Sequence, residues 1–201
     1  MKLRLSDRLF LLGAVLLAAW QIVVGIDHLS RQAIWAYTVA FGVLLVAALM
    51  LFILGFEALD SPVVVIVATV IPISLGFGLV WDHLPAWRIP FAAFAVTGLL
   101  AVAFTRYSRV SPLAQTIVLT VVHGLAGLLI FLLPLVAAFS GGARPAFALV
   151  GLGGALIGSA GLLLVFLRAG RPLLPREPLL RFFPALLLAM TACFAAGFLW
   201  G

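Results

Sequence analysis

The triplet Asp-His-Leu occurs twice in this sequence, and its two copies hold the side chains best suited to bind a divalent metal ion. Carboxylate and imidazole groups together are a plausible ligand set for such an ion, provided that both triplets lie on one surface. The candidate ligands are Asp27, His28, Asp82 and His83. The alternative, which we favour, is that both triplets end membrane helices, where polar residues reach the headgroups and histidine suits a helix carboxyl end.

The first triplet also carries a resemblance to a known family. Residues 25–29, GIDHL, resemble the GxDHL element of the HupE/UreJ nickel-permease family, and residues 122–124, VHG, are similar to a later His-Gly element of those proteins. The resemblance implies a small polytopic membrane protein that transports a divalent metal. This chain departs from the family at Gln21 and Ile22, which stand where the family has His-Pro, and it lacks the family's other histidines. The departure removes much of the family's metal site.

A third histidine, His123, lies near the middle of a long apolar stretch at residues 112–139. Ionisable residues inside a membrane are candidates for a functional site, because their polar groups need a partner there. Haem binding would need a second buried histidine, and the other two stand at the ends of their stretches, so we expect no haem or other cofactor. The interpretation we favour is a neutral imidazole that hydrogen-bonds a backbone carbonyl or the hydroxyl of Thr69, Thr97 or Thr191.

Two more polar residues complete the predicted pathway. Gln115 precedes His123 on the same apolar stretch, and Glu57 follows the second stretch of the chain. Glu57 could gate a pathway, but an ion pair with Arg106 or Arg109 at the same membrane edge is the commoner arrangement. These residues and His123 are the buried polar or pathway residues that the sequence predicts.

The motifs of common enzymes are absent from the sequence. It contains no HExxH metalloprotease motif, no GxSxG nucleophile elbow, and no serine–histidine pair with a plausible third member. The apolar stretches hold no chain of acids of the kind that proton pumps use. The single cysteine, Cys193, excludes an intramolecular disulfide and a cysteine-built metal site. We therefore expect a protein that is not an enzyme.

The elements that position these residues follow from the composition. Hydrophobic residues make up 66% of the 201 residues and charged residues only 9%, a balance that suits lipid and not water. A bilayer core needs about 20 apolar helical residues for each crossing, and uninterrupted apolarity predicts helices because barrel strands alternate polar and apolar residues. We predict one all-α transmembrane domain over residues 1–201. Its seven helices are expected at residues 10–26, 33–56, 62–81, 89–104, 112–139, 146–167 and 178–200.

The amino-terminal stretch has the basic start and apolar run of a signal peptide. The run continues to Ile26, which makes it longer than the apolar core of a cleaved signal. We therefore expect this stretch to remain as the first helix; cleavage after the small residues Ala18 and Ala19 is the alternative and would leave six helices in the same orientation.

The basic residues predict which way the chain crosses the membrane. With the amino terminus in the cytoplasm, the outer loops hold only Arg31, Arg88 and Arg144. The inner segments hold all other basic residues: Lys2, Arg4, Arg8, Arg106, Arg109, Arg168, Arg171, Arg176 and Arg181. This bias follows the positive-inside rule and predicts a protein of the cytoplasmic membrane. The net charge of +6 then indicates attraction to anionic lipids of the inner leaflet and no binding of nucleic acid.

The predicted helices show an internal repeat. Residues 27–41 and 82–96 align without a gap and share the Asp-His-Leu triplet, an Ile and an Ala. The third, fifth and seventh helices each begin at a proline, which costs no hydrogen bond in a first helical turn: Pro62, Pro112 and Pro178. The pattern predicts three two-helix units in parallel orientation, followed by a seventh helix.

A glycine-rich run marks the sixth helix. The spacing of Gly151, Gly154 and Gly158 lines up small residues on one helix face, which allows another helix to approach closely. A phosphate-binding loop would need a preceding strand and a soluble α/β unit, so we favour helix packing. The partner helix could belong to this chain or to another.

Two functions from different classes fit these observations. The first is a small permease or solute-binding membrane protein, supported by the repeat and by His123 at mid-depth, with divalent-metal transport as a variant of it. The second is a non-catalytic accessory or anchor subunit of a larger membrane complex, supported by the scarcity of buried charge, the glycine-rich helix face and the lack of any soluble domain.

Overall fold

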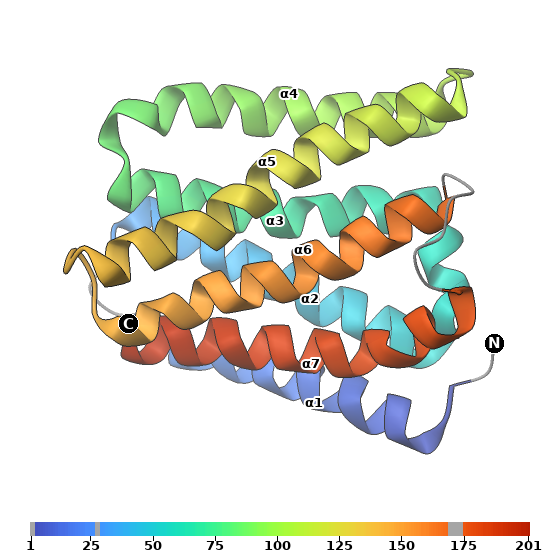
Figure 1. Cartoon of the computed structure of the whole chain (residues 1–201), viewed down its shortest axis with the longest axis horizontal. Helices are drawn as coiled ribbons and strands as arrows, with labels where there is room; N and C mark the ends of the chain where they lie inside the picture. Colours follow the sequence, from blue (N-terminus) through green and yellow to red (C-terminus); the bar gives the residue numbers. More distant parts are fainter. Residues whose placement is uncertain (1–2, 27–28, 169–174) are drawn as a thin grey trace.

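The computed structural model of the protein describes residues 3–26, 29–168 and 175–201 and is a bundle of α-helices (Figure 1). Within those residues seven helices are long and apolar enough to cross a membrane, and no strand is present. The predicted all-α fold and its seven spans are therefore confirmed. The helices are α1 Leu5–Val24, α2 Arg31–Leu54, α3 Pro62–His83, α4 Arg88–Tyr107, α5 Pro112–Phe139, α6 Ala148–Arg168 and α7 Arg176–Trp200, with short 3-10 helices η1 Gly55–Asp60, η2 Pro85–Trp87 and η3 Pro145–Phe147.

Caps and glycines set where several of these helices begin and end. The hydroxyls of Ser30 and Ser111 each accept a hydrogen bond at 3.2 Å from the backbone N–H three residues later, at the starts of α2 and α5. Gly25 and Gly55 end α1 and α2 with φ angles of 75° and 74°, a left-handed conformation that glycine adopts without steric strain. The polar turns between the apolar runs are thus held by local hydrogen bonds.

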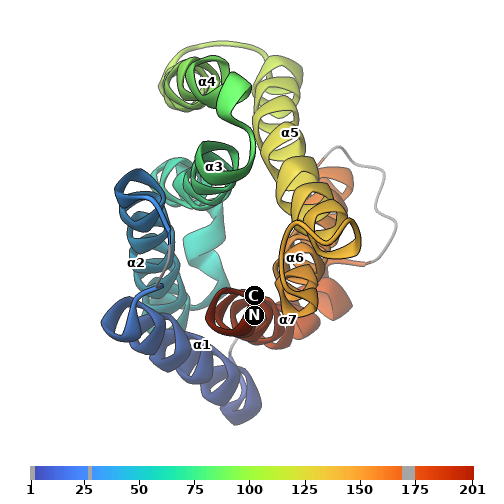
Figure 2. The ribbon, with the colours of Figure 1, turned by 90° about the vertical axis from the view of Figure 1, so that its left-hand side faces the viewer.

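Six of the seven helices form a closed ring, and α4 lies outside it (Figure 2). Around the ring α1 packs on α2, α2 on α3, α3 on α5, α5 on α6, α6 on α7, and α7 on α1. The side chains inside the ring form the main hydrophobic core, which includes Phe41, Leu44, Leu75, Met190 and Phe194. A second core fastens α4 to α3 and α5 through Ile73, Ala95, Val102 and Val122.

The three predicted two-helix units do not hold equivalent places in this ring. The first unit, α1 and α2, and the third, α5 and α6, lie wholly within the ring, whereas the second contributes α3 to the ring and leaves α4 outside. Each unit does pack as a helical hairpin. The repeat remains a prediction from the sequence.

Charged and tryptophan side chains mark the two ends of the bundle. The end at which α1, α3, α5 and α7 begin is named the arginine end, after Arg4, Arg8, Arg106, Arg109, Arg176 and Arg181. The opposite end, named the tryptophan end, holds all five tryptophans: Trp20, Trp35, Trp81, Trp87 and Trp200. Tryptophan is enriched at headgroup level, so the tryptophan end fits a membrane boundary. Which end faces the cytoplasm remains a prediction.

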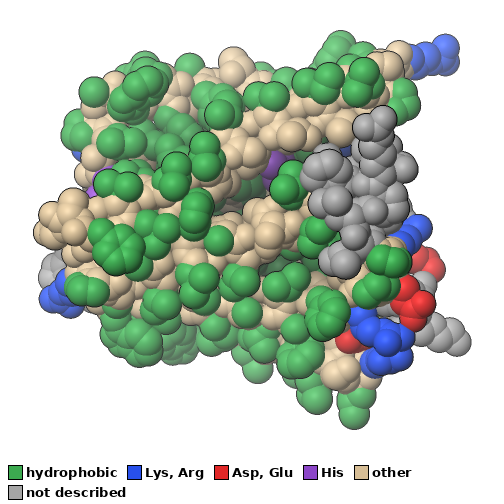
Figure 3. All heavy atoms as spheres, in the orientation of Figure 1, with side chains coloured by type: hydrophobic (Ala, Val, Ile, Leu, Met, Phe, Trp, Pro, Cys, Tyr) green, Lys and Arg blue, Asp and Glu red, His purple; other side chains and the backbone are tan. Residues whose placement is uncertain are grey.

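The outside of the bundle is apolar, as a lipid-facing surface requires. Large hydrophobic side chains stand exposed on α4 and α5, among them Leu100, Phe104, Leu113 and Leu128. Hydrophobic side chains cover most of the face shown in Figure 3. An apolar surface of this extent would cause aggregation in water, so the arrangement suits a multi-pass membrane protein.

Candidate functional site

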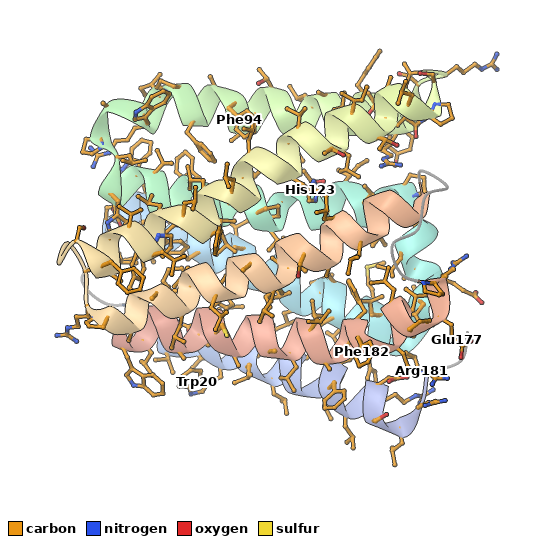
Figure 4. The ribbon with its side chains drawn as sticks, viewed as in Figure 1. Trp20, Phe94, His123, Glu177, Arg181 and Phe182 are labelled. Carbon is orange, nitrogen blue, oxygen red and sulfur yellow. The ribbon has the colours of Figure 1, made fainter. Side chains whose placement is uncertain are left out.

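His123 lies close to the centre of the longest helix. Helix α5 has 28 residues, and His123 is two to three residues from its midpoint, which is about 4 Å along the axis. The side chain points between α5 and α6, as the sticks in Figure 4 show. The adjacent Val122 is buried in the second core, so His123 stands at the edge of a well-packed region.

The imidazole of His123 is not satisfied by the threonines that the sequence suggests as partners. The hydroxyls of Thr69, Thr97 and Thr191 each donate a hydrogen bond at 2.7 Å to the backbone carbonyl one turn earlier on their own helices. The backbone of Leu119 interacts with the imidazole, but Nδ1 of His123 is buried and makes no hydrogen bond within the described part of the chain. Of the partners that the sequence suggests, the backbone of its own helix is thus the one that the imidazole lies against, at mid-depth.

Helix α6 packs on α5 through two glycines near the tryptophan end. A Cβ atom on Gly151 would lie 2.7 Å from the carbonyl oxygen of Phe131, and one on Gly154 would lie 2.8 Å from Cγ2 of Ile130. Only a residue without a Cβ atom permits this approach. Gly158, the third glycine of the predicted packing face, has no atom within 4 Å of its Cβ position. The two helices have therefore separated at the level of Gly158.

Where α5 and α6 separate, glycines of both helices face open space. The antiparallel register of α5 and α6, continued toward the arginine end, brings Gly158 level with Gly127 and Gly161 level with His123. A Cβ atom on Gly124, Gly127, Gly158 or Gly161 would meet nothing within 4 Å. These four glycines and His123 are named the α5/α6 wedge. Figure 1 shows the two helices meeting near the tryptophan end and diverging toward the arginine end.

Gln115 and Arg106 extend the polar groups from His123 toward the arginine end. Nη1 of Arg106, in the last turn of α4, donates a 3.5 Å hydrogen bond to Oε1 of Gln115 in the first turn of α5. The positive charge of Arg106 also acts on the imidazole of His123. Gln115 precedes His123 by eight residues, about 12 Å along the helix. Two of the three predicted pathway residues, His123 and Gln115, thus lie along one side of the bundle. Both interact with Arg106.

The third predicted pathway residue, Glu57, lies apart from these two. It stands in η1, between α2 and α3, and its side chain is exposed at the arginine end. The ion pair of Glu57 with Arg106 or Arg109 remains a prediction from the sequence. Glu177 and Arg181, in the first turns of α7, form the exposed ion pair labelled in Figure 4, with 2.7 Å between Oε1 and Nη2.

Asp82 and His83, one half of the predicted metal site, lie among aromatic rings at the tryptophan end. Oδ2 of Asp82 is buried without a hydrogen-bond partner among the described residues, and its charge acts on the phenol of Tyr37. The ring of His83 packs on that of Phe147, with 5.2 Å between centroids. Tyr37 packs on Phe198 in turn, with centroids 4.4 Å apart.

The complete predicted set of metal ligands remains a prediction from the sequence. The other half, Asp27 and His28, lies outside the described residues. The described parts of the chain contain no group of three or more His, Cys, Asp or Glu side chains that could hold a metal ion.

Three polar residues near the tryptophan end, Gln21, Tyr37 and Thr38, were not predicted from the sequence as site residues. Gln21 is almost fully buried in α1 and donates a 2.9 Å hydrogen bond from Nε2 to the carbonyl of Gly25, while its Oε1 has no partner among the described residues. Gln21, Tyr37 and Thr38 line a cavity of about 20 Å³ between α1 and α2, which is room for one water molecule. The sequence did carry a sign of them: Gln21 is a lone amide inside the first apolar stretch, and Tyr37 brings an aromatic hydroxyl in the second.

Comparison of the chain with protein-family models, curated proteins and solved structures finds no match. The resemblance of residues 25–29 to the nickel permeases is thus not supported by a family match. Any function must be argued from the geometry of the chain itself.

Proposed function

We propose that this chain is a small permease or solute-binding protein of the cytoplasmic membrane, without enzymatic activity, and that His123 is its polar contact to the solute. The observation that carries the proposal is the imidazole of His123, which lies near the centre of α5 and points between two membrane helices. Ionisable residues inside the membrane are candidates for functional sites, and a solute with a polar group could hydrogen-bond the imidazole at this depth.

Arg106 and Gln115 support the same proposal. They carry polar groups from the arginine end toward His123 along α4 and α5. With the arginine end in the cytoplasm, its side chains would also attract anionic lipids of the inner leaflet, by about 1 kcal/mol for each basic residue near the surface. The solute would then reach His123 from the side at which Arg106 and Gln115 lie.

Ligand-induced stabilisation of the purified chain tests this function. The protein would be reconstituted in lipid nanodiscs, and its thermal unfolding measured with a library of small solutes. A ligand present at 100 times its dissociation constant stabilises the folded protein by about 2.7 kcal/mol. We expect such shifts in the wild type and in His83→Ala, which removes a histidine distant from the wedge, and their loss in His123→Ala. The proposal is wrong if no solute stabilises the wild type, or if the shifts persist in His123→Ala.

The second candidate is an accessory or anchor subunit of a membrane complex. It is favoured by the open glycine faces of α5 and α6, because small residues allow close approach of a helix from another chain. Extraction of the native membrane in mild detergent distinguishes the two. A subunit copurifies with other membrane chains in fixed stoichiometry, whereas recovery of this chain alone excludes that function.

A further inference from the structure

The cavity between α1 and α2 near the tryptophan end has polar side chains in its wall. Its volume is about 20 Å³, and Gln21, Tyr37 and Thr38 supply the polar part of a mainly apolar lining. The two helices pack side by side around it (Figure 2). One water molecule needs about 10–15 Å³ of such a volume. The cavity therefore has room for one water molecule and not for a larger ligand.

Gln21 supplies a buried acceptor on the α1 side of the cavity. Its side chain is only 1% exposed. Nε2 donates a 2.9 Å hydrogen bond to the carbonyl of Gly25, whereas Oε1 is buried without a hydrogen-bond partner among the described residues. Buried polar atoms in folded proteins are nearly always paired with another protein group or with an ordered water molecule. Oε1 of Gln21 thus calls for a donor at the place where the cavity lies.

Tyr37 supplies a hydroxyl group on the α2 side, and its ring is held in place by two other helices. A Cβ atom on Gly78 of α3 would lie 2.6 Å from Cε1 and Cζ of the ring, so a glycine is needed there. On α7, the ring of Phe198 packs on that of Tyr37 with 4.4 Å between centroids. These contacts keep the tyrosine, which is 2% exposed, in the wall of the cavity.

A water molecule in this cavity would find the two to four hydrogen-bond partners that a buried water needs. It would donate one hydrogen to Oε1 of Gln21 and accept one from the hydroxyl of Tyr37. The hydroxyl of Thr38 donates its own proton to the carbonyl of Ile34 at 2.8 Å and keeps acceptor capacity for the second hydrogen of the water. A water-mediated contact of this kind is nearly as favourable as a direct hydrogen bond.

We propose that the cavity between α1 and α2 binds one ordered water molecule, which hydrogen-bonds Oε1 of Gln21 and the hydroxyl of Tyr37 and so joins the two helices. The inference goes beyond the proposed function and does not depend on His123. The charge of Asp82 on α3 acts on the phenol of Tyr37. The water thus belongs to a set of polar groups that reaches over three helices of the ring.

Solid-state NMR of the full chain in phosphatidylcholine bilayers tests the inference. Magnetisation is transferred from water protons to isotopically labelled glutamine and threonine side chains, and its build-up is followed in time. We expect the side chain of Gln21 to gain signal as early as that of Gln32, which is exposed in the first turn of α2. Thr191 serves as the dry control, because it is fully buried and its hydroxyl donates to the carbonyl of Leu187.

Two substitutions test whether the water bridges the helices. Tyr37→Phe removes only the hydroxyl and should raise the unfolding equilibrium constant about twofold to tenfold, the range expected for one lost hydrogen bond. In a Gln21→Leu background the same change should have little effect, because residues that share one partner are not additive. Tyr107→Phe, at an exposed tyrosine in the last turn of α4, should change nothing in either background. Unfolding midpoints would show that each variant folds.

Three outcomes would overturn the inference. Transfer to Gln21 as slow as that to Thr191 means that no water is bound, and any coupling of Gln21 to Tyr37 is then a direct contact. Early transfer with additive substitutions means that the water does not join the helices. A shift of the Gln21 signals when choline replaces sodium in the buffer would identify a cation in place of water. None of these outcomes touches His123, so the proposed function is tested separately.

Discussion

Substitution of single glycines on α6 by alanine would show where the helix contact ends. A Cβ atom on Gly154 would lie 2.8 Å from a side-chain carbon of Ile130 and 3.1 Å from two backbone atoms, the carbonyl carbon of Ile130 and the nitrogen of Phe131. The backbone of α5 cannot rotate away as a side chain can, so the helices must move apart. Overpacking of this kind costs about 1–3 kcal/mol, and we expect Gly154→Ala to destabilise the protein by that amount.

The same substitution at Gly158 should have the opposite sign. Nothing lies within 4 Å of its Cβ position, and alanine favours a helix over glycine by up to about 1 kcal/mol. We therefore expect Gly158→Ala to change the free energy of unfolding by between zero and about 1 kcal/mol in the stabilising direction. The two variants would then differ by at least about 1 kcal/mol, although both glycines belong to one GxxxG motif.

Reversible unfolding of the purified protein in mixed micelles, with increasing SDS, measures both values. Gly42→Ala, at a second open position on a different helix, shows how much of any gain comes from helix propensity alone. Equal destabilisation by Gly154→Ala and Gly158→Ala would mean that α5 and α6 stay in contact along the whole motif. That result would remove the wedge and refute the reasoning built on it.

Two predictions concern groups outside the wedge. Ser30→Ala removes the hydroxyl that caps α2, so the free energy of unfolding should fall by about 1 kcal/mol. Aspartate can also cap a helix, so Ser30→Asp should be as stable as the wild type if the lost cap is the cause. Glu177→Gln breaks the ion pair with Arg181, whose side chains are 67% and 44% exposed, so in the same assay stability should change by less than about 0.5 kcal/mol. A larger loss would show that this pair is buried in the folded protein.

The spans could be predicted from the sequence because lipid imposes a length and a polarity on every crossing. The start and end of α5, 112 and 139, agree with the structure. The start of α1 does not: the helix begins at Leu5 and not at residue 10. The carboxylate of Asp7 accepts a 2.8 Å hydrogen bond from the backbone N–H of Arg4, which lets the helix begin in a charged segment that hydropathy alone excludes.

The candidate site could be predicted only in part. The position of His123 in an apolar stretch indicated a buried polar residue, and the spacing of the glycines indicated a packing face on α6. The sequence could not show that this face is in contact at Gly154 and open at Gly158, because periodicity specifies which side of a helix faces its neighbour and says nothing of their separation. That separation depends on side chains of other helices.

The wedge follows from the way α5 divides its contacts between two sets of helices. In the half of α5 nearer the tryptophan end, Ile130 belongs to the main core and packs against α6 at Gly154. In the half nearer the arginine end, Val122 is buried in the second core, with Ile73 of α3 and Val102 of α4. A helix held by α6 at one end and by α3 and α4 at the other diverges from α6 along its length. His123 lies between these two sets of contacts, next to Val122 of the second core and seven residues before Ile130 of the main core.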